Sequence, residues 1–259
     1  MHRIVQYKKT PIKSQKDTRT MALIHGTVAL AGAGEYLPTM ANVDKVLLDQ
    51  SGGTARVIVL PTAAVPDGPE VTERWATMGI EHFVQLGVNV EAVMLRTRTD
   101  ANDDAIVAKL ASANFFYFSG GKPRYLLETL RGTTAWQTIK NVFLAGGIIA
   151  GCSAGAMVMG EVIFDFPQIW RTMPALGLVP GIAVIPHFNE LPSFLSNAAV
   201  WATRKTNVVG IDGSTALVWS HSQWTVLGSG RVTVFTQRRK AHYTAGERVP
   251  LPQLKRDTG

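Results

Sequence analysis

Phe143-Leu-Ala-Gly-Gly-Ile-Ile-Ala-Gly-Cys-Ser-Ala-Gly-Ala156 carries the clearest structural signal in this chain. A short apolar run rich in β-branched residues leads into a Gly-x-Ser-x-Gly pattern centred on Ser153, and a helix start is expected at 154–159. A serine on a sharp turn between a strand and a helix is typical of a nucleophile elbow. Glycines at 151 and 155 suit that turn, because side chains there would collide. A chance match in a glycine-rich chain is the alternative.

The composition is that of a folded protein without a membrane span. The 259 residues are 46% hydrophobic and 17% charged, and their length fits one large α/β domain or two small ones. The longest apolar stretches fall short of the roughly 18 residues that cross a bilayer. We therefore expect no membrane association.

The net charge of +7 lies mostly at the two ends of the chain. Residues 1–21 are basic but contain no apolar segment of the kind that secretory signals carry. We expect a flexible tail or, because Met21 ends this stretch, a start codon placed too early. Aromatic residues are not interleaved with these basic residues, which argues against a nucleic-acid arm. The remaining core is nearly neutral, and no nucleic-acid partner is expected.

Cys152 is the single cysteine of the chain, so no disulfide can form within it. This usage suits a reducing compartment, and we expect a cytoplasmic protein. Although Cys152 precedes Ser153, it would point away from the elbow. We interpret it as a small buried hydrophobic residue rather than a catalytic thiol.

Apolar runs alternate with helical patterns through the first 160 residues. The expected strands are 25–31, 56–60, 88–95 and 115–118, followed by one at the end of the apolar run 143–150. The expected helices are 41–49, 70–86, 103–110, 125–130, about 135–144 and 154–159. Such alternation is typical of βαβ units, which predicts a three-layer α/β sandwich around a mainly parallel sheet. Sites in such sheets form at the carboxyl ends of strands, where three chemically suggestive segments fall: 32–35, 120–121 and Ser153.

After Gly160 the expected strands are shorter: 182–185, 208–211, 216–220, 225–227 and 232–236. They predict an antiparallel extension of the sheet. With no linker or repeat visible, we expect a single domain over 22–238 and a loosely held tail over 239–259.

A serine nucleophile needs a base, and His187 is the best placed of the six histidines. It ends the expected strand in Val184-Ile-Pro-His-Phe-Asn189, roughly one helix and one strand after Ser153. His2 and His242 lie in the expected tails, His25 opens a strand, His82 lies within a helix, and His221 lies in a turn. A histidine that is partly buried and satisfied by backbone groups is the structural alternative for His187.

Five segments in order resemble the dipeptidase E and cyanophycinase family of serine peptidases. They are Ala31-Gly-Ala-Gly-Glu35, Pro61-Thr-Ala-Ala64, Phe118-Ser-Gly-Gly-Lys122, Gly151-Cys-Ser-Ala-Gly-Ala156, and Pro186-His-Phe188 with Gly210-Ile-Asp212 and Thr215-Ala-Leu217. The resemblance implies a flavodoxin-like fold similar to class I glutamine amidotransferases. It also implies cleavage of small aspartate-containing peptides, or of isopeptide bonds in an aspartate–arginine storage polymer.

Carried over by position, the resemblance implies that Ser153 is the nucleophile and His187 the general base. The oxyanion would lie against the backbone N–H of Ala154 and that of Gly120 or Gly121. A missing donor of this kind typically costs about 2.7–4 kcal/mol in the barrier.

The third member of the triad departs from the family pattern. A glutamate is expected directly after the aspartate, whereas this chain reads Gly210-Ile-Asp-Gly213. Asp212 is the nearest replacement, although a strand would turn its side chain to the opposite face. Asp165 and Glu161 are further candidates, and the absence of any acid is another alternative.

Recognition of the substrate also departs from the pattern. Cyanophycinase-like members carry arginines after their His-Phe pair, but 189–199 is nearly free of charge here. Lys122 and Arg124 are candidates for binding a substrate carboxylate, and Glu35 for binding a substrate amine. Surface charge is the alternative for the two cations, and a surface or helix-end role for Glu35.

These patterns favour a serine hydrolase that acts on a short peptide, without a metal or a cofactor. Ala31-Gly-Ala-Gly34 resembles half a dinucleotide motif but lacks its third glycine. A catalytically silent family member that binds a small ligand or a partner is the main alternative, because Gly213 replaces the acid. An esterase of the α/β-hydrolase type, with His221 or His242 as base, is a weaker one. The sequence leaves a homodimer open.

Overall fold

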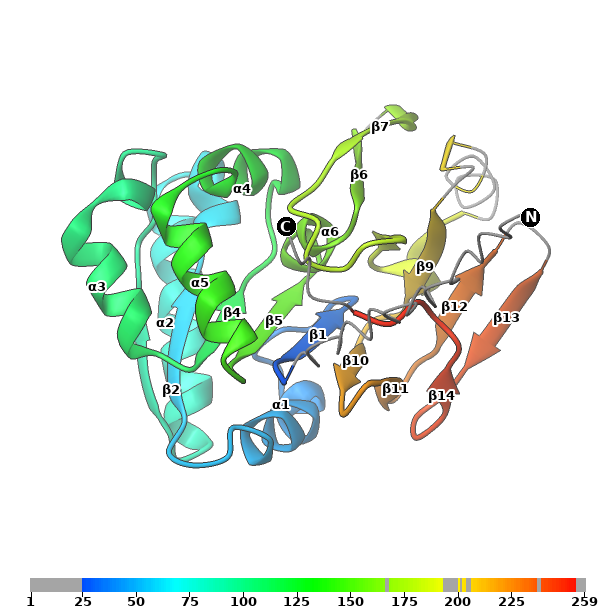
Figure 1. Cartoon of the computed structure of the whole chain (residues 1–259), viewed down its shortest axis with the longest axis horizontal. Helices are drawn as coiled ribbons and strands as arrows, with labels where there is room; N and C mark the ends of the chain where they lie inside the picture. The colour runs from blue at the N-terminus through cyan, green and yellow to red at the C-terminus, as the bar shows by residue number, and fades with distance from the viewer. Residues whose placement is uncertain are drawn as a thin grey trace, which may run out of the picture.

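A computed structural model describes residues 25–165, 168–192, 200, 202–203, 206–236 and 239–254. Eight of the described strands form one sheet in the order β14-β11-β10-β1-β5-β4-β2-β3, with helices on both faces (Figure 1). The expected α/β sandwich with a mainly parallel sheet is confirmed.

The parallel part of the sheet comes from the first 152 residues. It contains β1 (Thr27–Ala31), β2 (Arg56–Leu60), β3 (Asn89–Ala92), β4 (Phe115–Phe118) and β5 (Ile148–Cys152). Within this group the pairings are parallel, as in Ala31 beside Cys152, while β1 is antiparallel to the next strand on its other side. Successive residues point to opposite faces of a strand, so the apolar strands β1, β2, β4 and β5 are buried on both faces, whereas the edge strand β3 is partly exposed.

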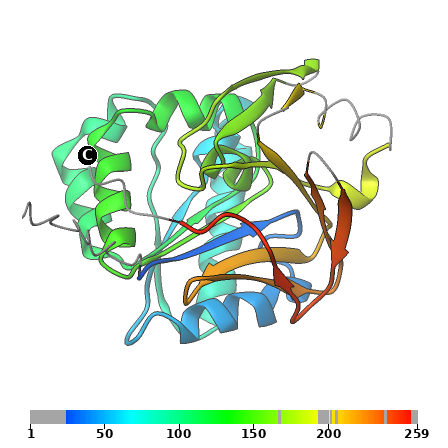
Figure 2. The same ribbon diagram turned by 45° about the vertical axis from the view of Figure 1, so that its right-hand side comes forward.

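Helices cover the two faces unequally. The helices are α1 (Ala41–Asp49), α2 (Pro69–Gln85), α3 (Asp104–Ser112), α4 (Pro123–Leu130), α5 (Thr134–Leu144) and α6 (Ala154–Met159). Buried residues of α1 and α2 pack against one face of the sheet, and those of α3 to α6 against the other. Figure 2 shows α1 along the lower side of the sheet.

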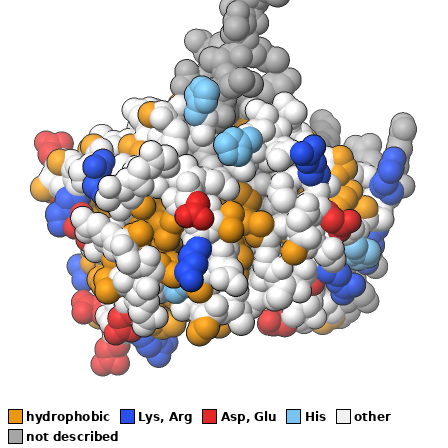
Figure 3. Space-filling view, turned by 90° about the horizontal axis from the view of Figure 1, so that it is seen from below, with side chains coloured by type: hydrophobic (Ala, Val, Ile, Leu, Met, Phe, Trp, Pro, Cys, Tyr) orange, Lys and Arg blue, Asp and Glu red, His pale blue; other side chains and the backbone are white. Residues whose placement is uncertain are grey.

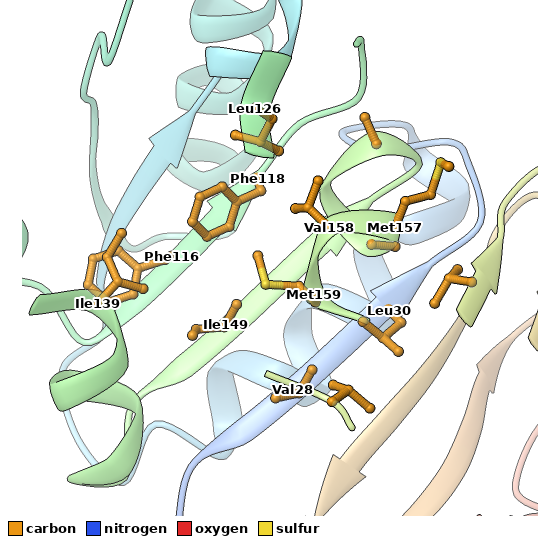
Figure 4. Packing of buried hydrophobic residues seen from close by; sticks show 14 of the residues in the cluster. Val28, Leu30, Phe116, Phe118, Leu126, Ile139, Ile149, Met157, Val158 and Met159 are labelled. Carbon is orange, nitrogen blue, oxygen red and sulfur yellow. The ribbon is translucent and has the colours of Figure 1, made fainter. Parts of the chain in front are cut away.

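The face under α4, α5 and α6 holds the larger core (Figure 4). Leu30 and Ile149 from neighbouring strands lie below Met159 of α6, while Phe116 and Phe118 face Ile139 and Leu126 from α5 and α4. All seven side chains are buried. This packing fixes α6 directly behind the carboxyl end of β5, where Ser153 lies.

The second half of the chain differs in part from the expected antiparallel extension. β10 (Thr215–Ser220), β11 (Gln223–Gly228) and β14 (Arg248–Val249) do extend the sheet in antiparallel fashion. β8 (Ile182–Ile185), β9 (Asn207–Ile211), β12 (Val232–Phe235) and β13 (Lys240–Tyr243) instead form a separate sheet, and β6 (Val162–Asp165) pairs with β7 (Gln168–Pro174). Strand spacing alone carried no information about which sheet each strand joins.

The expected loose tail over 239–259 requires a correction for its described part. β13 pairs with β12, β14 pairs with β11, and Val249 and Leu254 are buried. The indole of Trp224 donates a hydrogen bond to the carbonyl of Pro252. These contacts fasten residues 240–254 to the domain, whereas the expected basic tail over 1–21 lies outside the described residues.

Within the described residues, no helix combines the length and the apolar character that crossing a bilayer requires. Figure 3 shows the face that contains α1, seen from below, with acidic and basic side chains interspersed among small hydrophobic patches. The described part of this face offers no field of a single charge, in line with the near-neutral core expected from the sequence.

Candidate active site

Ser153 lies on a strained turn between β5 and α6. Its backbone has φ 51° and ψ −111°, a region that non-glycine residues rarely adopt. The flanking glycines are required by space: a Cβ at Gly151 would lie 2.5 Å from the backbone of Gly155, and one at Gly155 would lie 2.4 Å from the carbonyl of Phe118. The predicted elbow is therefore confirmed in its geometry, with the hydroxyl held at the carboxyl edge of the sheet.

His187 reaches Ser153 from the separate sheet. It follows β8 and adopts a left-handed conformation with φ 51°, and its Nε2 lies 3.2 Å from Ser153 Oγ. The ring of Phe188 packs so closely over Gly210 of β9 that a Cβ there would lie 2.3 Å from it. This packing fastens the turn that carries His187 to its own sheet.

The histidines of the esterase alternative lie elsewhere. His221 occupies the turn between β10 and β11, at the end of the sheet opposite to Ser153, because β10 runs antiparallel to β1. His242 is on β13, where its Nδ1 is hydrogen-bonded to Thr233. Neither histidine contacts Ser153 among the described interactions.

Two of the three expected oxyanion donors have free N–H groups in the described part of the chain. Ala154 is the first residue of α6, so its N–H has no acceptor within the helix. Gly121 has φ +136°, and a Cβ there would lie 2.3 Å from the carbonyl of Ala63. The N–H of Gly120, by contrast, donates to Oε1 of Glu35 at 2.8 Å, so it is already engaged.

Glu35 is a buried residue of the site rather than an exposed amine receptor. Its side chain is only 7% exposed, and its second oxygen, Oε2, lies 2.9 Å from the Cys152 sulfur. Burial raises the pKa of the Cys152 thiol well above its ordinary value, and the Glu35 charge raises it further. Cys152 therefore remains a protonated donor to Glu35, and Glu35 connects the turn at Gly120 with the end of β5.

None of the acids considered from the sequence contacts His187 among the described interactions. Asp212 accepts a hydrogen bond from the Arg231 N–H at 3.0 Å and pairs with its guanidinium. Asp165 faces Arg124 at 4.0 Å. Glu161 accepts hydrogen bonds from the Gly181 N–H and the Thr206 hydroxyl. The expectation that Asp212 orients the imidazole is thus corrected, because Arg231 holds its carboxylate.

Glu190 is the carboxylate that the structure places beside His187. Its Oε2 lies 3.5 Å from His187 Nδ1. The two residues are the ends of a short 3-10 turn, η4 (Phe188–Glu190) with His187 as its cap. The sequence contained the spacing His-x-x-Glu, but the left-handed turn that brings its ends together was not evident from residue types.

Lys122 and Arg124 are engaged in exposed ion pairs. Lys122 Nζ lies 3.1 Å from Asp67, and Arg124 pairs with Glu128 at 2.9 Å in addition to Asp165. Such surface pairs are weak, so a substrate carboxylate could compete for either cation. The structure itself gives neither residue a contact with Ser153 or His187 among the described interactions.

The described residues contain no group of three or more His, Cys, Asp and Glu side chains arranged to hold a metal ion. What they bring together is a hydroxyl, an imidazole within hydrogen-bond reach of it, and free backbone N–H groups. This combination suits nucleophilic attack on a carbonyl followed by proton transfer through the imidazole.

Comparisons with known proteins find similarity to peptidases over most of the chain. The family model of peptidase family S51 matches residues 28–227. A cyanophycinase from Synechococcus elongatus is 26% identical over 274 residues, covering 98% of this chain and 83% of that protein. An uncharacterised peptidase from Pasteurella multocida is 29% identical over 164 residues, covering 60% and 76%. The crystal structure of a peptidase from an acI-B1 Actinobacterium is 32% identical with a TM-score of 0.81, covering 87% and 98%.

Proposed function

Because the chain belongs to peptidase family S51, a family of hydrolases, we propose that it cleaves a short peptide or isopeptide through an acyl-enzyme on Ser153. His187 acts as the general base, and the N–H groups of Gly121 and Ala154 bind the oxyanion. The observation that carries this proposal is the 3.2 Å contact between Ser153 Oγ and His187 Nε2 on the elbow.

Acylation begins when Ser153 Oγ attacks the scissile carbonyl carbon and His187 Nε2 takes the hydroxyl proton. The carbonyl π electrons move to oxygen, and the resulting oxyanion lies against the two backbone donors. Collapse of this intermediate breaks the C–N bond, and the imidazolium gives its proton to the leaving amine. The product is an ester between the substrate's acyl group and Ser153.

Deacylation repeats the sequence with water in place of serine. His187 Nε2 takes a proton from the water as its oxygen attacks the ester carbon. The second intermediate collapses to release the carboxylic acid, and the proton returns to Ser153 Oγ. No metal or cofactor enters this sequence of steps.

For the substrate we propose a small aspartate-containing peptide, of the kind implied by the cyanophycinase and dipeptidase E resemblance. The printed sequence after His187 carries a single charge between 189 and 199, at Glu190, so recognition by an arginine cluster there is not part of the proposal. Lys122 and Arg124 are the cations proposed to meet a substrate carboxylate. A panel of aspartyl and β-aspartyl dipeptides, followed by amine release, measures the preference.

A fluorophosphonate probe tests the nucleophile without knowledge of the substrate. We expect the wild-type protein to gain one adduct, formed when Ser153 Oγ displaces fluoride from phosphorus, and tandem mass spectrometry should locate it on the peptide with Ser153. The variant Ser153→Ala should gain none, and the control Cys152→Ala should label like wild type. Labelling that persists in Ser153→Ala would refute the proposal.

A silent, ligand-binding family member is the second candidate function, and Gly213 is the observation that favours it. The position where the family pattern has a glutamate carries no side chain here. In that case the wild-type protein would remain unlabelled by the probe, although folded. The same experiment therefore separates the two functions.

We also propose a cytoplasmic location, since the single cysteine is buried and unpaired and suits a reducing compartment. The proposed partner is the peptide substrate alone, with neither nucleic acid nor a membrane. A homodimer stays open and can be decided by sedimentation.

A further inference from the structure

We infer that Glu190 replaces the missing triad acid and acts as the residue that positions the His187 imidazole. This inference rests on the proposed function of Ser153 and His187. It assigns to a residue three positions after the base the task that the family pattern gives to the position of Gly213.

The local backbone explains why these two side chains meet. His187 is left-handed, and the Glu190 N–H donates to the His187 carbonyl at 2.9 Å, which closes the 3-10 turn. This hydrogen bond between positions i and i+3 closes a single turn, which brings residues 187 and 190 close together. The turn therefore holds Glu190 Oε2 at 3.5 Å from His187 Nδ1.

The two intervening residues fasten this turn to the protein. Phe188 packs over Gly210 and lies edge-on to Phe235, with 5.7 Å between ring centroids. The Oδ1 of Asn189 accepts a hydrogen bond from the Gly213 N–H at 2.8 Å. Because both neighbours are held, the turn keeps its place, with His187 in contact with Ser153 on one side and Glu190 on the other.

The other acids considered as partners for His187 form hydrogen bonds or ion pairs with other residues. Asp212, Asp165 and Glu161 bind other groups, as described above. The internal residues that the structure does not describe contain neither aspartate nor glutamate. Among the described carboxylates, Glu190 is the one that contacts His187.

A carboxylate next to His187 Nδ1 favours the imidazole tautomer and the imidazolium charge that catalysis requires. The negative charge of Glu190 near Nδ1, at an ion-pair distance of 3.5 Å, favours the tautomer with the proton on Nδ1, which leaves the lone pair of Nε2 free to accept the Ser153 proton. When Nε2 becomes protonated, the negative charge of Glu190 stabilises the imidazolium. His187 and Glu190 side chains are 46% and 64% exposed, so water and salt weaken the pair and its effect is modest.

The test is the kinetics of inactivation by the fluorophosphonate probe. We expect Glu190→Gln to lower the limiting inactivation rate about threefold to tenfold with an unchanged half-saturation concentration, because orientation of the base affects the chemical step and not binding. Glu190→Asp, which keeps the charge on a shorter side chain, should fall between the two. The control Glu128→Gln, at a glutamate of similar exposure (62%) paired with Arg124, should match wild type.

Salt provides a second readout that a purely structural role would not change. Raising NaCl from about 0.05 to 1 M screens an exposed pair, so the wild-type rate should fall towards that of Glu190→Gln, whose own rate should change little. A Glu190→Gln variant that reacts at the wild-type rate overturns the inference and leaves the proposed function intact. An unlabelled wild-type protein would instead refute the proposed function itself.

Discussion

Replacement of His187 by alanine is expected to lower kcat by about four to six orders of magnitude, the range seen when a triad base is removed. His187 Nε2 is the basic nitrogen that the described structure places within reach of Ser153 Oγ, at 3.2 Å. Without it the hydroxyl keeps its proton and attacks slowly. Peptide hydrolysis under single-turnover conditions measures the loss, and added imidazole should restore part of the rate by entering the vacated space.

Two matched controls accompany this variant. His221→Ala removes an exposed histidine at the opposite end of the sheet and should leave kcat within about twofold, since surface substitutions rarely have larger effects. His242→Ala removes the residue bonded to Thr233 on β13. A large loss of activity in either control, with His187→Ala still active, would favour the esterase arrangement.

Replacement of Glu35 by alanine is expected to lower kcat about 100- to 1,000-fold, the cost of a misplaced oxyanion donor. The Glu35 carboxylate holds the Gly120 N–H at 2.8 Å and the Cys152 thiol at 2.9 Å, so it ties the turn after β4 to the strand that delivers Ser153. Its loss frees the neighbouring Gly121 N–H to move. The rate of probe labelling and kcat should fall together.

Glu35→Gln and Cys152→Ala distinguish the contributions of the two Glu35 hydrogen bonds, one with the Gly120 N–H and one with the Cys152 thiol. The amide oxygen of glutamine can still accept from Gly120, so we expect about a tenfold loss at most, because a neutral acceptor is weaker than a charged one. Cys152→Ala removes the thiol and leaves the Gly120 bond, and its kcat should stay within about threefold of wild type. Circular dichroism verifies that each variant is folded. If Glu35→Ala retained wild-type kcat, the turn at Gly120 would need no such support.

Much of the fold was predictable because its first half obeys simple periodicity. The helix over 41–49, the strands over 56–60 and 115–118 and the helix over 154–159 were expected with the bounds that the structure has. Strands buried on both faces are continuous apolar runs, which stand out against amphipathic helices. The resemblance to the dipeptidase E and cyanophycinase family, drawn from five short segments, is confirmed as well.

The arrangement of the strands in the second half of the chain was harder to predict, because it depends on pairing between distant segments. The strands β8, β9 and β12 look like those of any antiparallel extension, and long-range pairing decides which sheet they join. β13 and β14 are short, and in their four and two residues only Val249 is buried, so nothing in residues 240–249 distinguished them from a tail.

The residues of the candidate site also fall into those that the sequence pattern located and those that it did not. The places of Ser153 and His187 at the ends of two apolar strands, β5 and β8, were predictable from the sequence pattern, while their catalytic roles stay predictions. Glu35 and Glu190 were assigned other roles or missed, since burial of a carboxylate and the hand of a single turn depend on the folded surroundings. The sequence pattern favoured Asp212 as the acid that orients His187. In the structure its carboxylate accepts a hydrogen bond from the N–H of Arg231, 19 residues further along the chain.

The backbone at Ser153 has a consequence for the stability of the whole domain. A non-glycine residue at φ 51° costs about 1–3 kcal/mol, and the crowded glycines at 151 and 155 prevent the turn from relaxing. A chain with glycine at position 153 would escape this cost, so Ser153→Gly should melt at a higher temperature than Ser153→Ala, although both are inactive. Backbone strain at the elbow is therefore a cost that this protein carries for keeping a serine, rather than a glycine, at its nucleophile position.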